Sequence, residues 1–169
     1  MKNKKGFTLI ETLLYILLIS MFLLISSAVL IQILQGVQKT DQMHEVNEGG
    51  TNAMIRIMTT IRNAESVTTP TQGTTSPKLI LAMPSPSANP TIFVIEDELI
   101  KIKEGTSATT TLTADEVRVT DIQFTNTGSV GSPDSVHVEF TIESQQTDVG
   151  VGEPVSKIFR GSGTIRKRL

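Results

Sequence analysis

The 169-residue sequence contains no cysteine and no tryptophan. Without cysteine the chain has neither a disulfide nor a thiolate metal site, and its redox compartment cannot be inferred from cysteine usage. Small exported domains often depend on disulfides, so this chain must rely on its apolar core or on neighbouring subunits. That core is expected to be aliphatic, because only four phenylalanines lie beyond the first 33 residues: Phe93, Phe124, Phe140 and Phe159.

Neither sign of charge predominates. The chain has 15 lysines and arginines against 17 acids, for a net charge of -2, which gives no reason to expect a nucleic-acid partner. The basic tail at Arg166–Leu169 is too short to predict an anionic ligand. The motifs G-x-x-x-x-G-K, HExxH and GxSxG are also absent. The sequence therefore predicts no catalytic residue, no cofactor and no metal.

Charge is scarcest between Phe7 and Ile31, where Glu11 is the only charged residue. An apolar run of this length is typical of a membrane-spanning helix, since about 20 apolar residues cross a bilayer. A secretory signal peptide is the competing interpretation, but its apolar run is about 7–15 residues and precedes a small-residue cleavage site. A carboxylate at the centre of a spanning helix costs about 2.5–3.5 kcal/mol and less near the interface. We therefore expect Glu11 to have a function.

The residues before and at the start of this run form the stretch Lys4-Lys5-Gly6-Phe7-Thr8-Leu9-Ile10-Glu11. K-G-F-T-L-I-E followed by an apolar helix resembles the class III leader of type IV prepilins and pseudopilins. The resemblance implies that a membrane aspartyl prepilin peptidase cuts after Gly6 and methylates the new amine of Phe7. It also implies three other partners: further pilin or pseudopilin subunits, an assembly platform membrane protein and the lipid bilayer. An ordinary single-pass anchor is the alternative, and it leaves Glu11 unexplained.

Three lysines precede the apolar run: Lys2, Lys4 and Lys5. Positive charge beside the first spanning helix keeps that end cytoplasmic. We therefore expect the rest of the chain outside the bacterial inner membrane, and later in a pilus or pseudopilus. Once freed, the amine of Phe7 is cationic, because its pKa is near 8. Glu11 of one subunit is then the natural partner of this amine on a neighbouring subunit. Such a pair offsets the cost of a buried carboxylate and fixes axial register.

The helix is expected to continue to about Ala64. Gly49-Gly50 either kinks this helix or permits close packing. In the apolar part, Ser20, Ser26 and Ser27 either lie at contacts between helices or bond back to their own helix. An apolar stripe with spacings of three and four predicts one buried face: Val46, Gly50, Ala53, Met54, Ile57, Met58 and Ile61.

The segment from Lys78 onward predicts strands. The strongest signal is Ser135–Ser144, where apolar and polar residues alternate and so predict one wet face. Thr91–Ile95 and Leu99–Lys103 form a predicted hairpin around the turn Glu96-Asp97-Glu98. Two polar stretches, Ser66–Pro77 and Gly105–Thr113, are expected to be loops.

Two further strands are expected near the C-terminus. The alternation in Val117–Thr125 slips at Thr120-Asp121, which predicts a β-bulge. Ser156–Arg166 is the last expected strand, weakened by Gly161 and Gly163.

These elements predict an α+β fold, a long N-terminal helix packed on an antiparallel β-sheet. The expected division is a leader at 1–6, a transmembrane helix at 7–33, its amphipathic continuation at 34–65 and a β-rich domain at 78–169. Ala53–Val67 also loosely resembles the helix end of the minor J-type or W-type pseudopilins. The resemblance implies a structural subunit; a membrane-anchored receptor or adhesin is the alternative, in which the helix is only a tether.

A few polar residues are weaker candidates for chemistry. His44 and His137 are either metal ligands or surface residues, and isolated histidines are usually the latter. Glu96-Asp97-Glu98 and Asp115-Glu116 could form a calcium or acid–base site. Turns are enriched in such residues for local bonding, so the sequence favours turns here.

Overall fold

The computed structural model describes residues 8–129, 131–145 and 154–166. The chain divides into two compact units, Met1–Thr40 and Asp41–Leu169, and each is described by itself. The α+β fold predicted from the sequence is confirmed: one long helix and antiparallel strands make up the described part of the chain.

Helix α1 runs from Leu9 to Asn63 without interruption. In the first unit its apolar side chains are exposed, and its most apolar 18-residue window has a mean hydropathy of 2.7. By length and composition, this part of the helix can cross a membrane. Ser20 and Ser27 donate to the carbonyls of Leu17 and Leu24 at 2.8 and 3.1 Å, so both bond back to their own helix.

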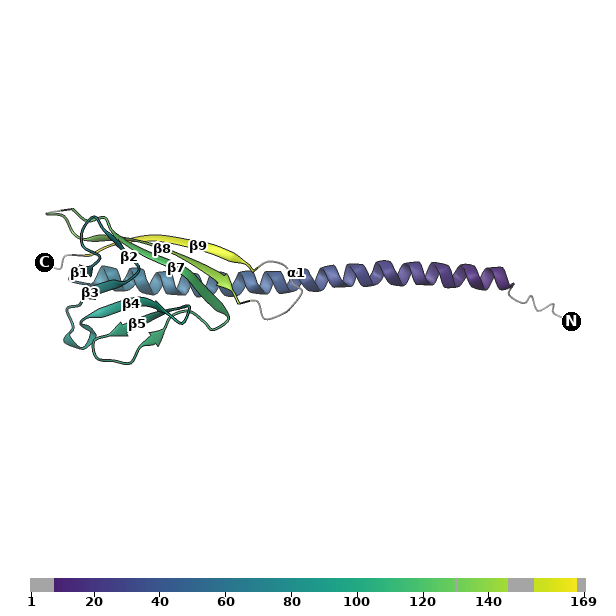
Figure 1. Cartoon of the computed structure of the whole chain (residues 1–169), viewed down its shortest axis with the longest axis horizontal. Helices are drawn as coiled ribbons and strands as arrows, with labels where there is room; N and C mark the ends of the chain where they lie inside the picture. Colours follow the sequence, from purple (N-terminus) through teal and green to yellow (C-terminus); the bar gives the residue numbers. More distant parts are fainter. Residues whose placement is uncertain (1–7, 130, 146–153, 167–169) are drawn as a thin grey trace. The chain divides into compact units, whose positions relative to one another are not determined.

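In the second unit, α1 presents the predicted apolar stripe to a core. The buried residues follow a helical period: Val46, Gly50, Ala53, Ile57, Met58, Thr60 and Ile61. They join the apolar residues of the strands in one cluster, which includes the fully buried rings of Phe93, Phe124 and Phe140. Figure 1 shows β8 and β9 along one side of this part of the helix and β4 and β5 along the other.

The strands form two antiparallel sheets where the sequence predicted one. The first has the order β1-β3-β4-β5-β6, with β1 Ser66–Thr69, β3 Leu79–Ala82, β4 Thr91–Glu96, β5 Leu99–Glu104 and β6 Thr110–Thr111. The second has the order β2-β7-β8-β9, with β2 Thr75–Ser76, β7 Val117–Asn126, β8 Ser135–Ser144 and β9 Ser156–Thr164. A short 3-10 helix, η1, covers Pro86–Ala88 between β3 and β4.

Three short strands lie where loops were expected, so that expectation was partly wrong. β1 and β2 fall within Ser66–Pro77, and β6 falls within Gly105–Thr113. All three are at sheet edges. Their threonines are β-branched and favour extended backbone, but an edge strand open to solvent needs no apolar alternation, so the sequence carried no period-two signal.

Several strand predictions are confirmed. β8 alternates as expected, with Val136, Val138, Phe140 and Ile142 buried. The register of β7 against β8 shifts between Val119 and Asp121, which is the expected bulge. β4 and β5 form the expected hairpin. Its two turn residues, Asp97 and Glu98, both have positive φ, 55° and 61°, as in a type I′ turn.

β9 lies unusually close to α1, and glycines make this possible. A Cβ on Gly50 would lie 2.1 Å from the ring of Phe159, and a Cβ on Gly161 would lie 2.7 Å from Sδ of Met54. A Cβ on Gly163 would lie 3.1 Å from Cγ2 of Ile61, a tight contact. Of the two interpretations of Gly49-Gly50, close packing is therefore the one that the structure supports.

Candidate functional site

The N-terminal end of α1 is capped by Thr8. The amide of Glu11 donates to Oγ1 of Thr8 at 3.4 Å. The carbonyl of Thr8 accepts from the amides of Glu11 and Thr12 at 3.1 and 3.2 Å. Thr8-Leu9-Ile10-Glu11 also has the T-x-x-E spacing of a capping box. This cap was not among the sequence predictions, although its signal lies inside the motif.

Glu11 lies in the first turn of α1. A carboxylate there interacts favourably with the unpaired amides and positive dipole end of the helix. Its Oε1 also accepts a hydrogen bond from the hydroxyl of Tyr15 at 3.4 Å. Glu11 is partly exposed. The same side chain therefore stabilises the helix start and remains accessible to a partner.

The other residues predicted for processing lie outside the described part of the chain: Lys2, Lys4, Lys5, Gly6 and Phe7. The first described residue, Thr8, is the second residue after the expected cut. Cleavage after Gly6 and methylation of Phe7 therefore stay predictions.

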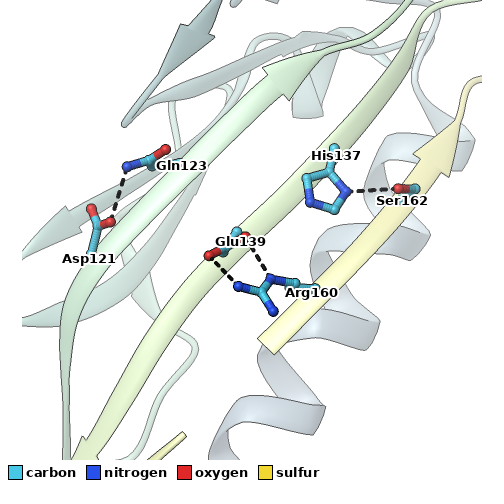
Figure 2. A network of polar contacts seen from close by, with 6 residues as sticks. All are labelled: Asp121, Gln123, His137, Glu139, Arg160 and Ser162. Atoms are coloured by element: carbon cyan, nitrogen blue, oxygen red, sulfur yellow. Dashed lines mark hydrogen bonds and ion pairs between the residues drawn. The ribbon is translucent and has the colours of Figure 1, made fainter. Parts of the chain in front are cut away.

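A second group of polar residues lies on the wet face of the sheet formed by β7, β8 and β9 (Figure 2). Arg160 donates to both carboxylate oxygens of Glu139, at 2.8 and 3.1 Å. Nδ1 of His137 lies 3.0 Å from Oγ of Ser162. Both contacts join residues directly opposite each other on β8 and β9. They form a cross-strand ladder that stabilises the sheet.

This ladder shifts the pKa values of its ion pair. The hydrogen bonds from Arg160 hold the pKa of Glu139 below its ordinary value, and the charge of Arg160 adds to this. The same contacts raise the pKa of Arg160. Both side chains are largely exposed, at 61% for Arg160 and 40% for Glu139. Solvent therefore screens the pair, and we assign it no catalytic role.

The remaining polar candidates form local contacts. Nζ of Lys101 lies 2.5 Å from Asp97 and 3.9 Å from Glu96. The hydrogen bond to Asp97 raises the pKa of Lys101. His44 lies 3.8 Å from Glu48 on the next turn of α1. Two of the three turn acids between β4 and β5, Glu96 and Asp97, thus bind Lys101.

Asp115 and Glu116 form a turn directly before β7. Glu116 also lines an open surface hollow of about 400 Å³, together with Glu45, Glu48, Gly49, Asn52, Leu112 and Ala114. Within the residues described by the structure, no three histidines, aspartates or glutamates come together as metal ligands.

Comparison with known proteins identifies the N-terminal segment. Residues 1–27 match the family model described as the prokaryotic N-terminal methylation motif. Neither a search of curated proteins nor a search of solved structures gave a match. The motif is found in structural, pilin-like proteins, and by family inference it implies a prepilin peptidase and other pilins as partners. With the apolar helix, it also suggests a location in a membrane or pilus. The chain therefore combines a pilin-like N-terminal methylation motif with an α+β fold of the pilin type.

Proposed function

We propose that this chain is a minor pilin or pseudopilin, a structural subunit of a type IV pilus, a type II secretion system or a competence filament. A prepilin peptidase cuts after Gly6 and methylates Phe7. The subunit then leaves the bacterial inner membrane with the help of an assembly platform protein and packs into the filament by its helix. The observation that carries this proposal is the match of residues 1–27 to the methylation motif, directly joined to a long apolar helix.

In this proposal each part of the chain has a place. Residues 1–6 are the leader, 7–33 span the membrane and 34–65 continue the helix, which ends at Asn63. The domain outside comprises residues 78–169 together with β1 and β2, which pair into its sheets. The three leader lysines hold the N-terminus in the cytoplasm. The minor class is favoured by the resemblance of Ala53–Val67 to J-type and W-type subunits, and by the lack of cysteine and the threonine-rich segments.

Glu11 provides the assembly contact. In the filament its carboxylate pairs with the amine of Phe7 on a neighbouring subunit. An unpaired carboxylate in an apolar core is strongly unfavourable, and pairing offsets that cost. The partly exposed position of Glu11 in the first turn of α1 supports this role.

Mass spectrometry tests the proposal directly. The full chain is expressed together with a prepilin peptidase, and the membrane fraction is analysed intact. We expect a chain that begins at N-methylated Phe7. A Gly6→Leu variant should keep the leader, because a side chain at the cut obstructs the extended backbone. An uncut chain in the presence of active peptidase would overturn the proposal.

The alternative function is a single-pass, membrane-anchored receptor or adhesin. In its favour, residues 41–169 have an apolar core of their own, as a tethered binding domain would need. Such a protein has no use for the glycine, the phenylalanine and the glutamate of the motif. An anchored protein would reach the membrane uncut and function equally well without Glu11.

A further inference from the structure

β9 forms an edge of its sheet, and no described strand pairs with its outer side. The strand is 9 residues long and pairs with β8 without a register shift. Proteins usually protect such an edge by shortness, proline, a bulge or charged side chains. Of these, β9 has only the charges of Lys157 and Arg160. An added strand can therefore pair with it if the charges are complementary.

The hydrogen bonds at the two ends of β9 show which backbone groups point outward. The amide of Ser144 donates to the carbonyl of Val155, and the amide of Ile165 donates to the carbonyl of Asp134, both at 2.9 Å. In an antiparallel ladder, residues bonded to the partner alternate with residues that point away. The odd-numbered residues of β9 thus bond to β8. Outward-pointing amides and carbonyls belong to Ser156, Ile158, Arg160, Ser162 and Thr164.

The helix surface next to this edge is also left exposed by the residues that the structure describes. Gly49 faces Val117 of β7, and Gly50 faces Phe159 of β9. Successive helix residues are about 100° apart, so Thr51 lies one step further in the same direction, beyond β9. Ile55 follows one turn later and is 59% exposed. The inward side chains of a strand added to β9 would cover Ile55.

Cations surround this surface. Lys157 contacts Oδ1 of Asn47 and lies 5.2 Å from the ring centre of Phe159. At the other end of β9, the amide of Arg166 donates to the carbonyl of Arg62 at 3.4 Å. Lys157, Arg62 and Arg166 form no ion pair with a described carboxylate. The surface therefore has an apolar side chain, Ile55, in its middle and cations at both ends, and Glu48 lies two turns before Ile55 on the same helix face.

We propose that the outer edge of β9 binds an extended segment of another polypeptide by strand addition. The inward residues of this segment are β-branched in the middle, where they cover Ile55, and acidic at the ends, where they meet Lys157 and Arg62. A second copy of β9 fits poorly, because it would place Lys157 and Arg160 near like charges. This inference does not depend on the processing or assembly proposed above.

Hydrogen exchange on the full chain in detergent micelles tests the inference. The probe is the peptide acetyl-ETVTVTVTE-amide, and the charge control is acetyl-KTVTVTVTK-amide. With the acidic peptide in excess, we expect exchange at Ile158, Arg160 and Ser162 to slow by about tenfold or more. Amides of odd-numbered residues, already bonded to β8, should change little. The basic peptide should bind at least about tenfold more weakly.

Two variants at one position separate backbone pairing from side-chain effects. Ser162→Pro removes an outward amide without removing a bond to β8, and should weaken binding of the acidic peptide about tenfold or more. Ser162→Ala loses the same contact with His137 but keeps the amide, so its affinity should match the parent chain. Arg62→Glu leaves the pairing of β8 and β9 intact and should lower the affinity for the acidic peptide at least about threefold.

Three results would overturn the proposal. The first is unchanged exchange at the outward amides with the acidic peptide in excess. The second is equal binding of the acidic and basic peptides. The third is self-association of the chain through this edge, seen as a concentration-dependent dimer that Ser162→Pro abolishes and Ser162→Ala retains, which would make a second copy the occupant.

Discussion

Gly49 and Gly50 are neighbours in α1, but only Gly49 has room for a side chain. A Cβ on Gly49 would lie 3.6 Å from Cγ2 of Val117, an ordinary contact. A Cβ on Gly50 would lie within 2.6 Å of three atoms of the Phe159 ring. That ring is held by stacking on Phe140, with centroids 5.4 Å apart. One glycine is thus replaceable, and the other is required by its surroundings.

We expect Gly50→Ala to destabilise the second unit by about 1–3 kcal/mol, the usual cost of overpacking. Gly49→Ala should be neutral or stabilising by up to about 1 kcal/mol, since alanine favours the helix. Calorimetric unfolding of the full chain in detergent would measure both. Equal effects of the two variants would contradict the close contact with Phe159.

The Glu139–Arg160 pair predicts a pH dependence. The pKa of Glu139 is lower in the folded state than its ordinary value of 4.5. The contribution of this carboxylate to folding stability is therefore fully present above pH 4.5, and it is lost as the pH falls through the pKa of the folded state. The charges acting on it are Arg160 and His137, while Gln123 opposite on β7 is uncharged.

Glu139→Gln should therefore have a lower Tm than the parent chain at pH 7. In strong acid, where Glu139 of the parent is protonated, the two Tm values should converge. Melting curves of parent and variant across this range give the comparison. Arg160→Gln serves as the control and should remove the same pH-dependent contribution to the Tm. A Tm difference that is constant from pH 7 to strong acid would exclude the predicted titration.

Among the elements, the β4–β5 hairpin has an unusual turn sequence. Type I′ turns favour Asn-Gly because both central residues have positive φ. Here Asp97 and Glu98 occupy these positions. Asp97 is held by Lys101. Among the described residues the side chain of Glu98 forms no hydrogen bond or ion pair, while its backbone carbonyl accepts from the amide of Val119 at 2.7 Å.

We expect Glu98→Gly to stabilise the second unit by about 0.5–1 kcal/mol, because glycine adopts this backbone without steric cost. The measurement is again the unfolding temperature. Gly105→Ala is the opposite control: its φ is 56°, and a Cβ would lie 2.3 Å from the carbonyl oxygen of Ser87. It should be destabilising. A stability loss in Glu98→Gly would indicate an unrecognised role of the glutamate.

Local patterns predicted most elements of this fold. α1, β8 and the bulge in β7 follow from periods of 3.6 and 2 in single segments. The division into two sheets did not follow, because strand order depends on pairing between distant residues. The role of Gly161 and Gly163 was also missed. They weaken β9 locally, but they permit its approach to Met54 and Ile61, which only the folded structure reveals.

Of the candidate sites, the sequence predicted the one at Glu11 but not the open edge of β9. Glu11 stands out in the sequence because it is a lone charge in an apolar run. The cap by Thr8 has a local signal too, the T-x-x-E spacing, but in this chain that spacing coincides with the family motif. The open edge of β9 depends on strand order, so no local pattern could have revealed it.

At the scale of the whole molecule, Glu11 has two possible contributions to assembly. It can pair with an amine of another subunit, and it can stabilise the start of α1 as the third residue after the Thr8 cap. Gln also serves at this capping position but carries no charge, whereas Val provides neither function. The two substitutions therefore separate the contributions.

We expect Glu11→Val and Glu11→Gln to insert into the membrane normally and both to impair incorporation next to partner subunits. Co-purification from the native membrane fraction measures incorporation, and fractionation measures insertion. If only Glu11→Val is impaired, helix capping explains the effect. Normal co-purification of both variants would contradict the pairing role.

The contact between Gly50 and Phe159 also has an evolutionary consequence. Because the ring fills the space that a Cβ at position 50 would need, changes at the two positions are coupled. A homologue with alanine at position 50 should carry a smaller residue at position 159. Homologues should thus have either glycine at position 50 with an aromatic residue at 159, or alanine at 50 with a shorter side chain at 159. Covariation of these two positions would then report how closely β9 packs on α1 in each homologue.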